Sequence, residues 1–262
     1  MAKQVPRSRS IDPASRTMPN TALTAEQIRG YRRDGFIVIE DFLSAAELQR
    51  WQHSVDAAVA MRNRTAETER RERLRATGLV AEDGGEPSYY ETVFTQRLQL
   101  WTDSPAMREI MLDPSIGKMA AELAGVDGIR IWHDQALIKE PFASPTGFQL
   151  DNPYWSYTNR DALSLWVALD DATEQNGAMI FCPGTHHKTE HERNSGIGAN
   201  LGELFELYPE WGEEGGGGGL MMPVTVPMKA GSCSFHNGML AHGAGANMTP
   251  GRRRAMTCGC EC

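Results

Sequence analysis

The sequence contains no run of about 18 apolar residues, the length that a membrane-spanning helix needs. It also has no apolar segment directly after the N-terminus, which a secretory signal peptide would require. Residues 1–20 instead carry four basic residues and a single acid, Asp12. Such a start can be a transit peptide, but we favour a disordered tail over residues 1–20. We therefore expect a cytoplasmic protein with no membrane partner.

Cysteine is scarce, with five residues, three of which lie at the end of the chain as Cys258, Cys260 and Cys262. The number is odd and no secretory signal is present, so we expect free thiols in a reducing compartment. The one-residue gaps also differ from the two-residue gap of a zinc knuckle. The sequence therefore favours neither a disulfide framework nor a structural zinc site.

Positive charge is in deficit, with 26 Lys and Arg residues against 34 Asp and Glu residues and a formal net charge of −8. This balance disfavours a general nucleic-acid-binding role. The glycine run at residues 215–219 lacks the Lys-Ser/Thr that follows a phosphate-binding loop, so we expect a flexible loop tip there. Length and hydrophobic content of 40% fit one soluble domain, which we place at residues 21–262.

The first half of that domain has helical patterns. Thr24 and Ser44 each precede a Gln or Glu by three residues, which predicts two capped helices. The apolar residues 36–39 between them predict a short strand, and residues 104–123 predict a further helix. We expect a helical region over about residues 21–125, packed against whatever the second half forms.

Short strand patterns dominate from about residue 129 onward. Residues 163–170 alternate between apolar and other side chains, which predicts a strand with one buried face. Further short apolar runs at residues 129–132, 179–181, 224–226 and 232–240 are separated by Gly and Pro turns. Helices followed by many short strands predict a mainly β fold with flanking helices, with a jelly-roll core at about residues 129–258.

Three residues in this second half are suited to binding a metal and an acid. Asp151 and His242 offer a carboxylate and an imidazole, which are common transition-metal ligands, and Arg253 can bind a carboxylate through two hydrogen bonds. Each also has a structural interpretation. Asp151 can be a turn residue before Pro153, a single histidine is more often structural, and Arg253 lies within an arginine run of a kind that usually forms a solvated face.

Taken together, the segments around these residues resemble the phytanoyl-CoA dioxygenase family of Fe(II)/2-oxoglutarate oxygenases. The resemblance runs from Leu23 to about Thr257 and includes the segments 34–38, 132–135, 166–173, 183–186 and 235–245. It implies a double-stranded β-helix, that is, a cupin-like jelly-roll barrel. It also implies Fe(II), 2-oxoglutarate and O2 as cofactors and co-substrates, and hydroxylation of a small-molecule substrate whose identity the sequence does not give.

The resemblance assigns roles to individual residues. Asp151 and His242 are implied as metal ligands, and Gln149 stands where the family has a second histidine ligand. Arg253, eleven residues after His242, is implied to bind the far carboxylate of 2-oxoglutarate. The same comparison suggests Trp166 and Gln135 as neighbours of 2-oxoglutarate, although Trp166 can equally be a core residue. We expect His236 to support the metal ligands from the same side of its strand rather than to bind the metal.

Gln149 is the main departure from the family pattern. An amide oxygen is a weaker ligand than imidazole for a divalent transition metal, so we expect impaired iron binding. The alternative is a catalytically inactive relative that binds a small molecule or a protein partner. His133 is a further candidate for the missing ligand, and Asp151 argues against the halogenase variant of this chemistry. The chain also ends at Cys262, whereas members of the family usually continue further, so a truncated chain is a second explanation for any missing activity.

Overall fold

The computed structural model describes residues 18–77, 88–211 and 222–261. The predictions for the tail at residues 1–17, the glycine run at 215–219 and Cys262 lie outside these residues. The helices are α1 (Ala25–Asp34), α2 (Ala45–Thr77), α3 (Tyr89–Val93), α4 (Leu100–Asp103), α5 (Pro105–Met111), α6 (Pro114–Ala124) and α7 (Glu203–Leu207), with 3-10 turns η2 (Asn152–Tyr154), η3 (Thr185–His187) and η4 (Pro209–Trp211). The strands are β1 (Phe36–Ile39), β2 (Thr95–Leu98), β3 (Arg130–Lys139), β4 (Thr146–Gln149), β5 (Leu163–Ala168), β6 (Met179–Phe181), β7 (Val224–Val226), β8 (Cys233–Asn237), β9 (His242–Ala244) and β10 (Arg253–Glu261).

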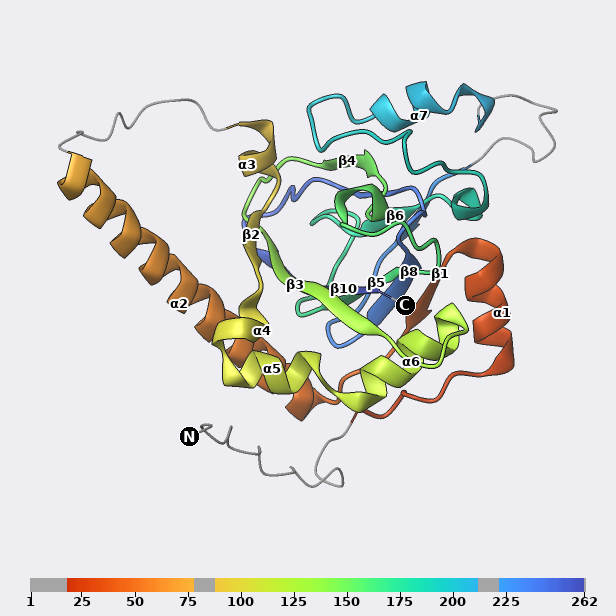
Figure 1. Ribbon diagram of the computed structural model, residues 1–262, viewed down its shortest axis with the longest axis horizontal. Helices are drawn as coiled ribbons and strands as arrows, with labels where there is room; N and C mark the ends of the chain where they lie inside the picture. The colour runs from red at the N-terminus through yellow and green to blue at the C-terminus, as the bar shows by residue number, and fades with distance from the viewer. Residues whose placement is uncertain (1–17, 78–87, 212–221, 262) are drawn as a thin grey trace, which may run out of the picture.

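The strands form two antiparallel sheets that pack against each other (Figure 1). The six-stranded sheet has the order β1-β8-β5-β10-β3-β2, and the four-stranded sheet has the order β4-β9-β6-β7. Trp166 of the larger sheet and Phe181 of the smaller sheet belong to one hydrophobic cluster. The expected combination of helices and antiparallel strands is therefore present, but the described strands do not close into a barrel.

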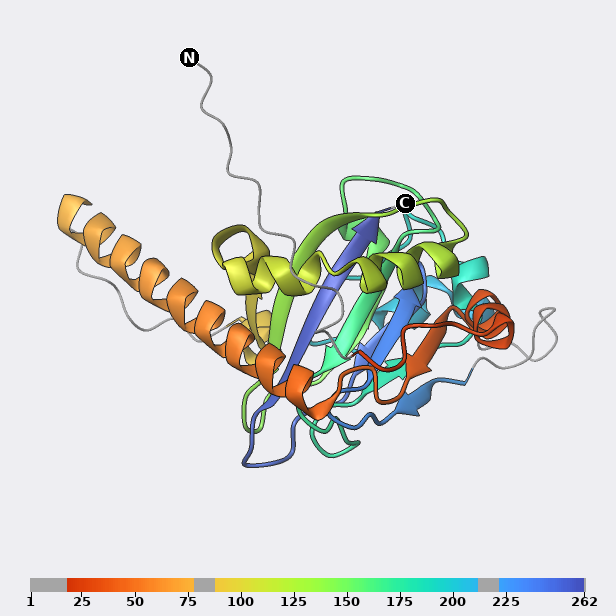
Figure 2. The same ribbon diagram turned by 90° about the horizontal axis from the view of Figure 1, so that it is seen from below.

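Helices cover the outer face of the larger sheet. Met107 of α5 and Met119 of α6 share a buried cluster with Leu163 and Leu165 of β5, and Figure 2 shows α5 and α6 lying across the strands. The single helix that we expected at residues 104–123 is two helices. The break has a local cause, because the side chain of Asp113 caps the N-terminus of α6 and Pro114 occupies its first turn.

The prediction that one face of β5 is exposed was wrong, because every residue of this strand is buried. Leu163, Leu165 and Val167 face the cluster beneath the helices, whereas Trp166 and Ala168 face the cluster between the sheets. The alternation of residue types therefore marks two different buried environments. A strand that is covered on both sides by other layers has no face exposed to solvent.

The first predicted helix and the strand that follows it are confirmed. Thr24 and Gln27 form the capping box of α1, and β1 covers residues 36–39. At the second box, the Glu47 N–H donates to Ser44 Oγ over 3.2 Å. The helix that starts there is long, since α2 continues to Thr77 and projects from the body of the molecule in Figures 1 and 2.

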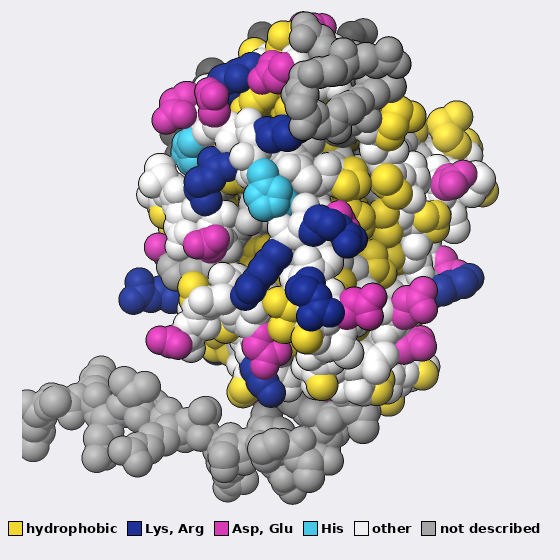
Figure 3. Space-filling model, turned by 90° about the vertical axis from the view of Figure 1, so that its right-hand side faces the viewer, with side chains coloured by type: hydrophobic (Ala, Val, Ile, Leu, Met, Phe, Trp, Pro, Cys, Tyr) yellow, Lys and Arg dark blue, Asp and Glu magenta, His cyan; other side chains and the backbone are white. Residues whose placement is uncertain are grey.

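The surface carries charges of both signs. On the face in Figure 3, which includes α1, basic and acidic side chains are interspersed around apolar ones, without a continuous basic area. Within the described residues, no helix is both long and apolar enough to cross a membrane.

Asp134 of β3 provides a test of the packing between α4 and the larger sheet. The residue is fully buried, its Oδ2 accepts a hydrogen bond from the Trp101 N–H over 3.0 Å, and burial raises its pKa to about 6. The unfolded carboxyl group loses its proton near pH 4, so folding stability should fall as the pH rises from about 4 to about 6.

Asp134→Asn keeps a side-chain oxygen for the Trp101 N–H and removes this charge. As the pH rises from about 4 to about 6, the difference in free energy of unfolding between this variant and the wild type should change by roughly 2 to 3 kcal/mol in favour of the variant. Urea unfolding monitored by tryptophan fluorescence at several pH values measures the difference. Parallel pH profiles for the two proteins would contradict the buried, ionisable state of Asp134.

Candidate metal and co-substrate site

Asp151 lies two residues after the end of β4 and is fixed by the loop before β9. The N–H groups of Asp151 and Asn152 both donate to the carbonyl of Gly238, over 2.9 and 2.8 Å. A Cβ atom on Gly238 would lie 2.6 Å from the ring of Trp155, so only glycine permits this close packing. The Ser164 hydroxyl of β5 donates to Asp151 Oδ2 over 2.6 Å. The carboxylate is therefore held from both sheets.

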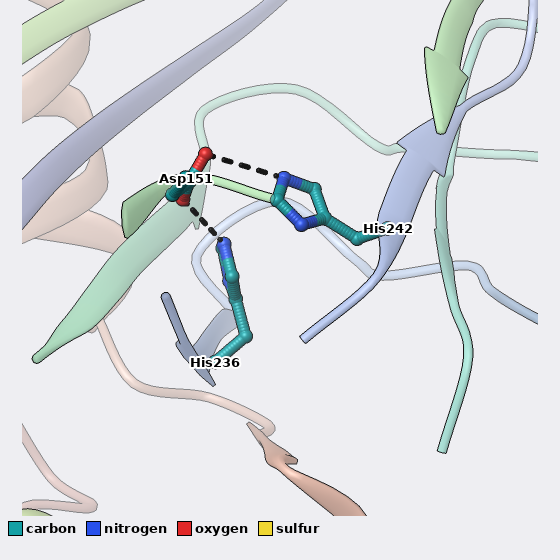
Figure 4. Close-up of side chains that lie close together, drawn as sticks. All are labelled: Asp151, His236 and His242. Atoms are coloured by element: carbon teal, nitrogen blue, oxygen red, sulfur yellow. Dashed lines mark hydrogen bonds and ion pairs between the residues drawn. The ribbon is translucent and has the colours of Figure 1, made fainter. Parts of the chain in front are cut away.

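His242, the first residue of β9, faces this carboxylate. Its Nδ1 donates to the carbonyl of Leu240 over 2.9 Å, which leaves Nε2 without a proton on the neutral ring and able to bind a metal. Nε2 lies 3.4 Å from Asp151 Oδ1 (Figure 4). A Cβ atom on the next residue, Gly243, would lie 2.9 Å from the Thr146 carbonyl, so glycine allows β9 to approach β4 closely.

His236 of β8 contacts the other oxygen of the same carboxylate. Its Nε2 lies 3.2 Å from Asp151 Oδ2, and Figure 4 shows both imidazoles pointing toward Asp151 from different strands. Ligand atoms of Asp151, His236 and His242 all lie within 4.8 Å of one another. We call these three residues the metal-binding cluster, and carboxylate and imidazole are donor types that suit a divalent transition metal such as iron.

The electrostatics of this cluster keep the carboxylate ionised. Burial alone would raise the pKa of Asp151, but the two histidines hold it well below its ordinary value. Burial lowers the pKa of His242, and the stronger combined effect of Asp151 and the Leu240 carbonyl raises it. The pKa of His236 is lowered, because burial outweighs its hydrogen bond to Asp151. The anionic carboxylate is the form that a metal cation needs.

Gln149 is the last residue of β4 and pairs directly with His242 of β9. Directly opposed residues of an antiparallel pair point to the same face of the sheet, so the amide lies on the side of the metal-binding cluster. Its Oε1 is buried and has no hydrogen-bond partner among the described residues. A buried acceptor without a partner is costly and suggests that a ligand completes it.

Arg253 supplies positive charge in the same cavity. It is 2% exposed, its guanidinium carbon lies 5.3 Å from the centre of the Trp166 ring, and Nη2 donates to the Gly177 carbonyl over 3.2 Å. Nε and Nη1 are buried and have no partner among the described residues. Burial lowers the pKa of Arg253 to about 10, so the group remains charged at neutral pH. An unpaired, buried guanidinium is prepared to bind an anion.

The neighbouring basic residues have other partners. Arg254 forms ion pairs with Asp170 over 2.6 Å and Asp56 over 2.8 Å, and Arg252 lies 3.3 Å from Asp56. Lys139, opposite Arg253 in the β3–β10 pair, donates to the carbonyls of Ser144 and Val93. Burial and the charge of Arg253 lower the pKa of Lys139 to about 7. Arg253 is thus the member of the arginine run that faces the cavity.

Two connected cavities meet at Gln149 and Asp151. The inner cavity has a volume of about 90 Å³ and is lined by His236, His242, Arg253 and Trp166 among others. The outer cavity has a volume of about 540 Å³. Residues that line both are Tyr90, Gln96, Gln135, Gln149, Asp151 and Ile197. The metal-binding cluster therefore lies where a compact inner ligand and a larger outer ligand would meet.

The other candidates from the sequence lie in or beside these cavities. Gln135 accepts a hydrogen bond from the Gln96 amide at the junction. His133 lines the outer cavity but does not belong to the metal-binding cluster. Ser164, which hydrogen-bonds to Asp151, was not predicted. Its position two residues before Trp166 on the same strand was the available signal, since alternate residues of a strand share a face.

Comparisons with known proteins agree with this geometry. The family model for phytanoyl-CoA dioxygenase matches residues 31–255. The chain is 28% identical to a probable α-ketoglutarate-dependent hypophosphite dioxygenase of Stutzerimonas stutzeri, over 90% of this chain and 77% of that protein. It is 24% identical to human peroxisomal phytanoyl-CoA dioxygenase, over 92% of this chain and 69% of that protein.

Among solved structures, the non-haem α-ketoglutarate-dependent carbocyclase SnoK from nogalamycin biosynthesis superposes with a TM-score of 0.68. The two chains are 25% identical, and the match covers 91% of this chain and 83% of the carbocyclase. The fold as well as the sequence therefore relates this chain to iron- and 2-oxoglutarate-dependent oxygenases.

The unpaired guanidinium of Arg253 gives a direct test of anion binding. Arg253→Ala should weaken binding of 2-oxoglutarate at least about a hundredfold, because it removes two hydrogen bonds to a charged group, each of which contributes roughly 1.5 to 3 kcal/mol. Isothermal titration calorimetry with Mn²⁺ in place of iron measures the dissociation constant. Arg252→Ala, which removes a surface charge, is the matched control and should leave it unchanged. Equal affinities for Arg253→Ala and wild type would assign the anion to another residue.

Proposed function

Because the chain belongs to the phytanoyl-CoA dioxygenase family, we propose that it is an Fe(II)/2-oxoglutarate-dependent dioxygenase that hydroxylates a small organic molecule, with activity limited by Gln149. One observation carries the proposal. Asp151, His242 and the unpaired guanidinium of Arg253 line one narrow cavity, which opens into a larger one at the metal-binding cluster. A cluster that binds a cation beside a group that binds an anion suits a metal-bound keto acid.

In this proposal Asp151 Oδ1 and His242 Nε2 bind the iron. Iron with 2-oxoglutarate and O2 supplies an oxidation that releases succinate and carbon dioxide and inserts one oxygen atom into a C–H bond of the substrate. Ser164 and His236 hold Asp151 Oδ2, so that Oδ1 faces His242. The Leu240 carbonyl keeps the proton of His242 on Nδ1 and away from the metal side of the ring.

Arg253 binds the far carboxylate of 2-oxoglutarate, and Trp166 and Gln135 form walls of that pocket. The packing of Trp166 against the guanidinium keeps water from this end of the cavity, which strengthens the ion pair. We also propose that the two sheets are the two halves of a double-stranded β-helix. Their face-to-face packing, with the metal-binding cluster between them, supports this more specific description of the fold.

Gln149 sets the limit on activity. Its Oε1 is available as a third donor, but an amide oxygen is a neutral, hard ligand that suits Ca²⁺ or Mg²⁺ better than iron. A second candidate function follows from the same residue. If Gln149 prevents iron from binding, the chain retains the cavities and acts as a binding protein for a small molecule or a partner.

Gln149→His distinguishes these two functions. We expect the variant to bind iron at least about tenfold more tightly than wild type, since loss of even an indirect contact with a metal ligand costs that much. We also expect it to gain 2-oxoglutarate decarboxylation, measured as succinate produced. Gln99→His, which places a histidine in the outer cavity only, is the matched control. A normal oxygenase rate in the wild type would show that Gln149 imposes no limit, and an inert Gln149→His would favour the binding function.

His236 is expected to orient Asp151 rather than to bind the metal. His236→Asn retains a hydrogen-bond donor toward Asp151, whereas His236→Leu does not. We expect His236→Leu to lower Mn²⁺ affinity about 10- to 100-fold and His236→Asn to lower it less. The electron paramagnetic resonance spectrum of bound Mn²⁺ is the second readout and should not change in His236→Asn. Complete loss of metal binding in both variants would make His236 a ligand instead.

A further inference from the structure

We propose that the outer cavity binds an uncharged molecule with a flat ring system, and that this is the class of substrate presented to the metal site. The inference rests on the proposed function only in calling this molecule a substrate. The residues that line the cavity select the ligand whether or not the oxidation takes place. Its volume of about 540 Å³ suits a ligand of drug-like size, whereas the inner cavity of about 90 Å³ suits a much smaller one.

Large apolar side chains surround the mouth of this cavity. Trp132, Tyr154, Leu98 and Tyr90 line it, although they are 38%, 55%, 45% and 37% exposed. They come from four separate elements or turns, so the exposure is not a feature of one loop. Exposed aromatic groups that converge on a cavity mark a ligand-binding surface, and their ring faces favour stacking with a flat partner.

Two tryptophans that line this cavity, Trp132 and Trp155, pack against a further aromatic ring, that of Tyr157. The ring centres of Trp132 and Tyr157 lie 5.7 Å apart with the planes nearly perpendicular, and those of Trp155 and Tyr157 lie 5.5 Å apart. Trp155 is itself fixed by the close approach of Gly238. This packing gives the ligand a rigid surface, which reduces the entropy lost on binding.

No lysine or arginine is among the described residues that line the outer cavity, and its single carboxylate is Asp151 at the inner end. The nearby Arg62 forms an ion pair with Asp103 over 2.6 Å, and Arg97 donates to Asn63 over 2.6 Å. Burial lowers the pKa of His133, which keeps its ring neutral at pH 7. A phosphate or carboxylate would lose water here without gaining a counter-ion, which is strongly unfavourable.

Uncharged polar groups provide the hydrogen bonds. Gln96, Gln99 and Gln135 lie along the cavity, and Tyr90 donates to Gln96 Oε1 over 2.7 Å. Amides both donate and accept, so they recognise hydroxyl, ether and carbonyl groups. The lining therefore matches a neutral ring-bearing molecule with oxygen substituents, and it does not match the phosphates of an acyl thioester of coenzyme A.

A set of three coumarins tests the class of ligand. The probes are neutral 7-methoxycoumarin, anionic 7-methoxycoumarin-3-carboxylate and a cationic 7-methoxycoumarin with an aminomethyl group. We expect the neutral probe to bind the full-length chain at least about tenfold more tightly than either charged probe, because a buried charge without a partner is unfavourable. Calorimetry, in the presence and absence of Mn²⁺ and 2-oxoglutarate, gives the dissociation constants. Equal or tighter binding of a charged probe, or no binding by any probe at millimolar concentration, overturns the proposal.

Variants locate the binding. Trp132→Ala should weaken binding of the neutral probe at least about fivefold, since the substitution removes a stacking surface. Phe142→Ala removes an aromatic side chain that is 70% exposed and lies outside the cavity, and should have no effect. Leu98→Arg adds a cation at the mouth and should improve binding of the carboxylate probe about tenfold relative to the neutral probe. Equal losses in Trp132→Ala and Phe142→Ala would place the probe elsewhere and overturn the assignment.

The two proposals fail separately. If the cavity prefers the neutral probe but neither the wild type nor Gln149→His consumes 2-oxoglutarate with iron, the oxygenase proposal fails. The proposed ligand class of the cavity then still holds. If the chain consumes 2-oxoglutarate but binds a charged probe most tightly, the oxygenase proposal holds and the proposed ligand class fails.

Discussion

The carboxylate of Asp151 is the group on which the arrangement of the site depends. An ionised carboxylate that is largely removed from water is unfavourable unless hydrogen bonds and opposite charges compensate for the lost hydration. Here a serine from the larger sheet and one histidine hold the first oxygen, and a second histidine faces the other oxygen. The backbone of the same residue is fixed by the Gly238 carbonyl. The compensation brings β4, β5, β8 and β9 together at one point.

Positive charge is buried at the other end of the inner cavity, where compensation is incomplete. Among the described residues, none is a partner of Arg253 Nε or Nη1, and the hydrogen bonds that the neighbouring Lys139 donates go to carbonyl groups. Such a pair destabilises the protein until an anion binds, which gives the binding of a dicarboxylate a favourable electrostatic contribution. The inner cavity therefore separates a carboxylate that attracts a cation from a guanidinium that attracts an anion, and a keto acid bound to a metal satisfies both.

Gln149 is the side chain that separates the two proposed functions. The residue has the register and the orientation of a donor beside His242, but it offers a neutral oxygen where imidazole would bind iron more strongly. Gln149 also lines the outer cavity, but the aromatic side chains and the other glutamines of that lining do not depend on this choice. Loss of oxidative activity and retention of ligand binding are thus physically independent in this chain, and the two functions proposed can be separated by changing one residue.

Several elements of the fold could be predicted from the sequence because they depend on local sequence patterns. The capping box at Thr24, the strand at residues 36–39 and the order of helices before strands all follow from short-range patterns. The family resemblance selected Arg253, eleven residues after His242, as the arginine for the co-substrate, and Arg253 lines the inner cavity. Only tertiary structure decided the rest. β5 is buried on both faces because other layers cover it, and Ser164 and His236 meet Asp151 because three strands that are distant in sequence converge. The outer cavity is likewise formed by side chains from separate elements, so its uncharged lining appears in no single segment of the chain.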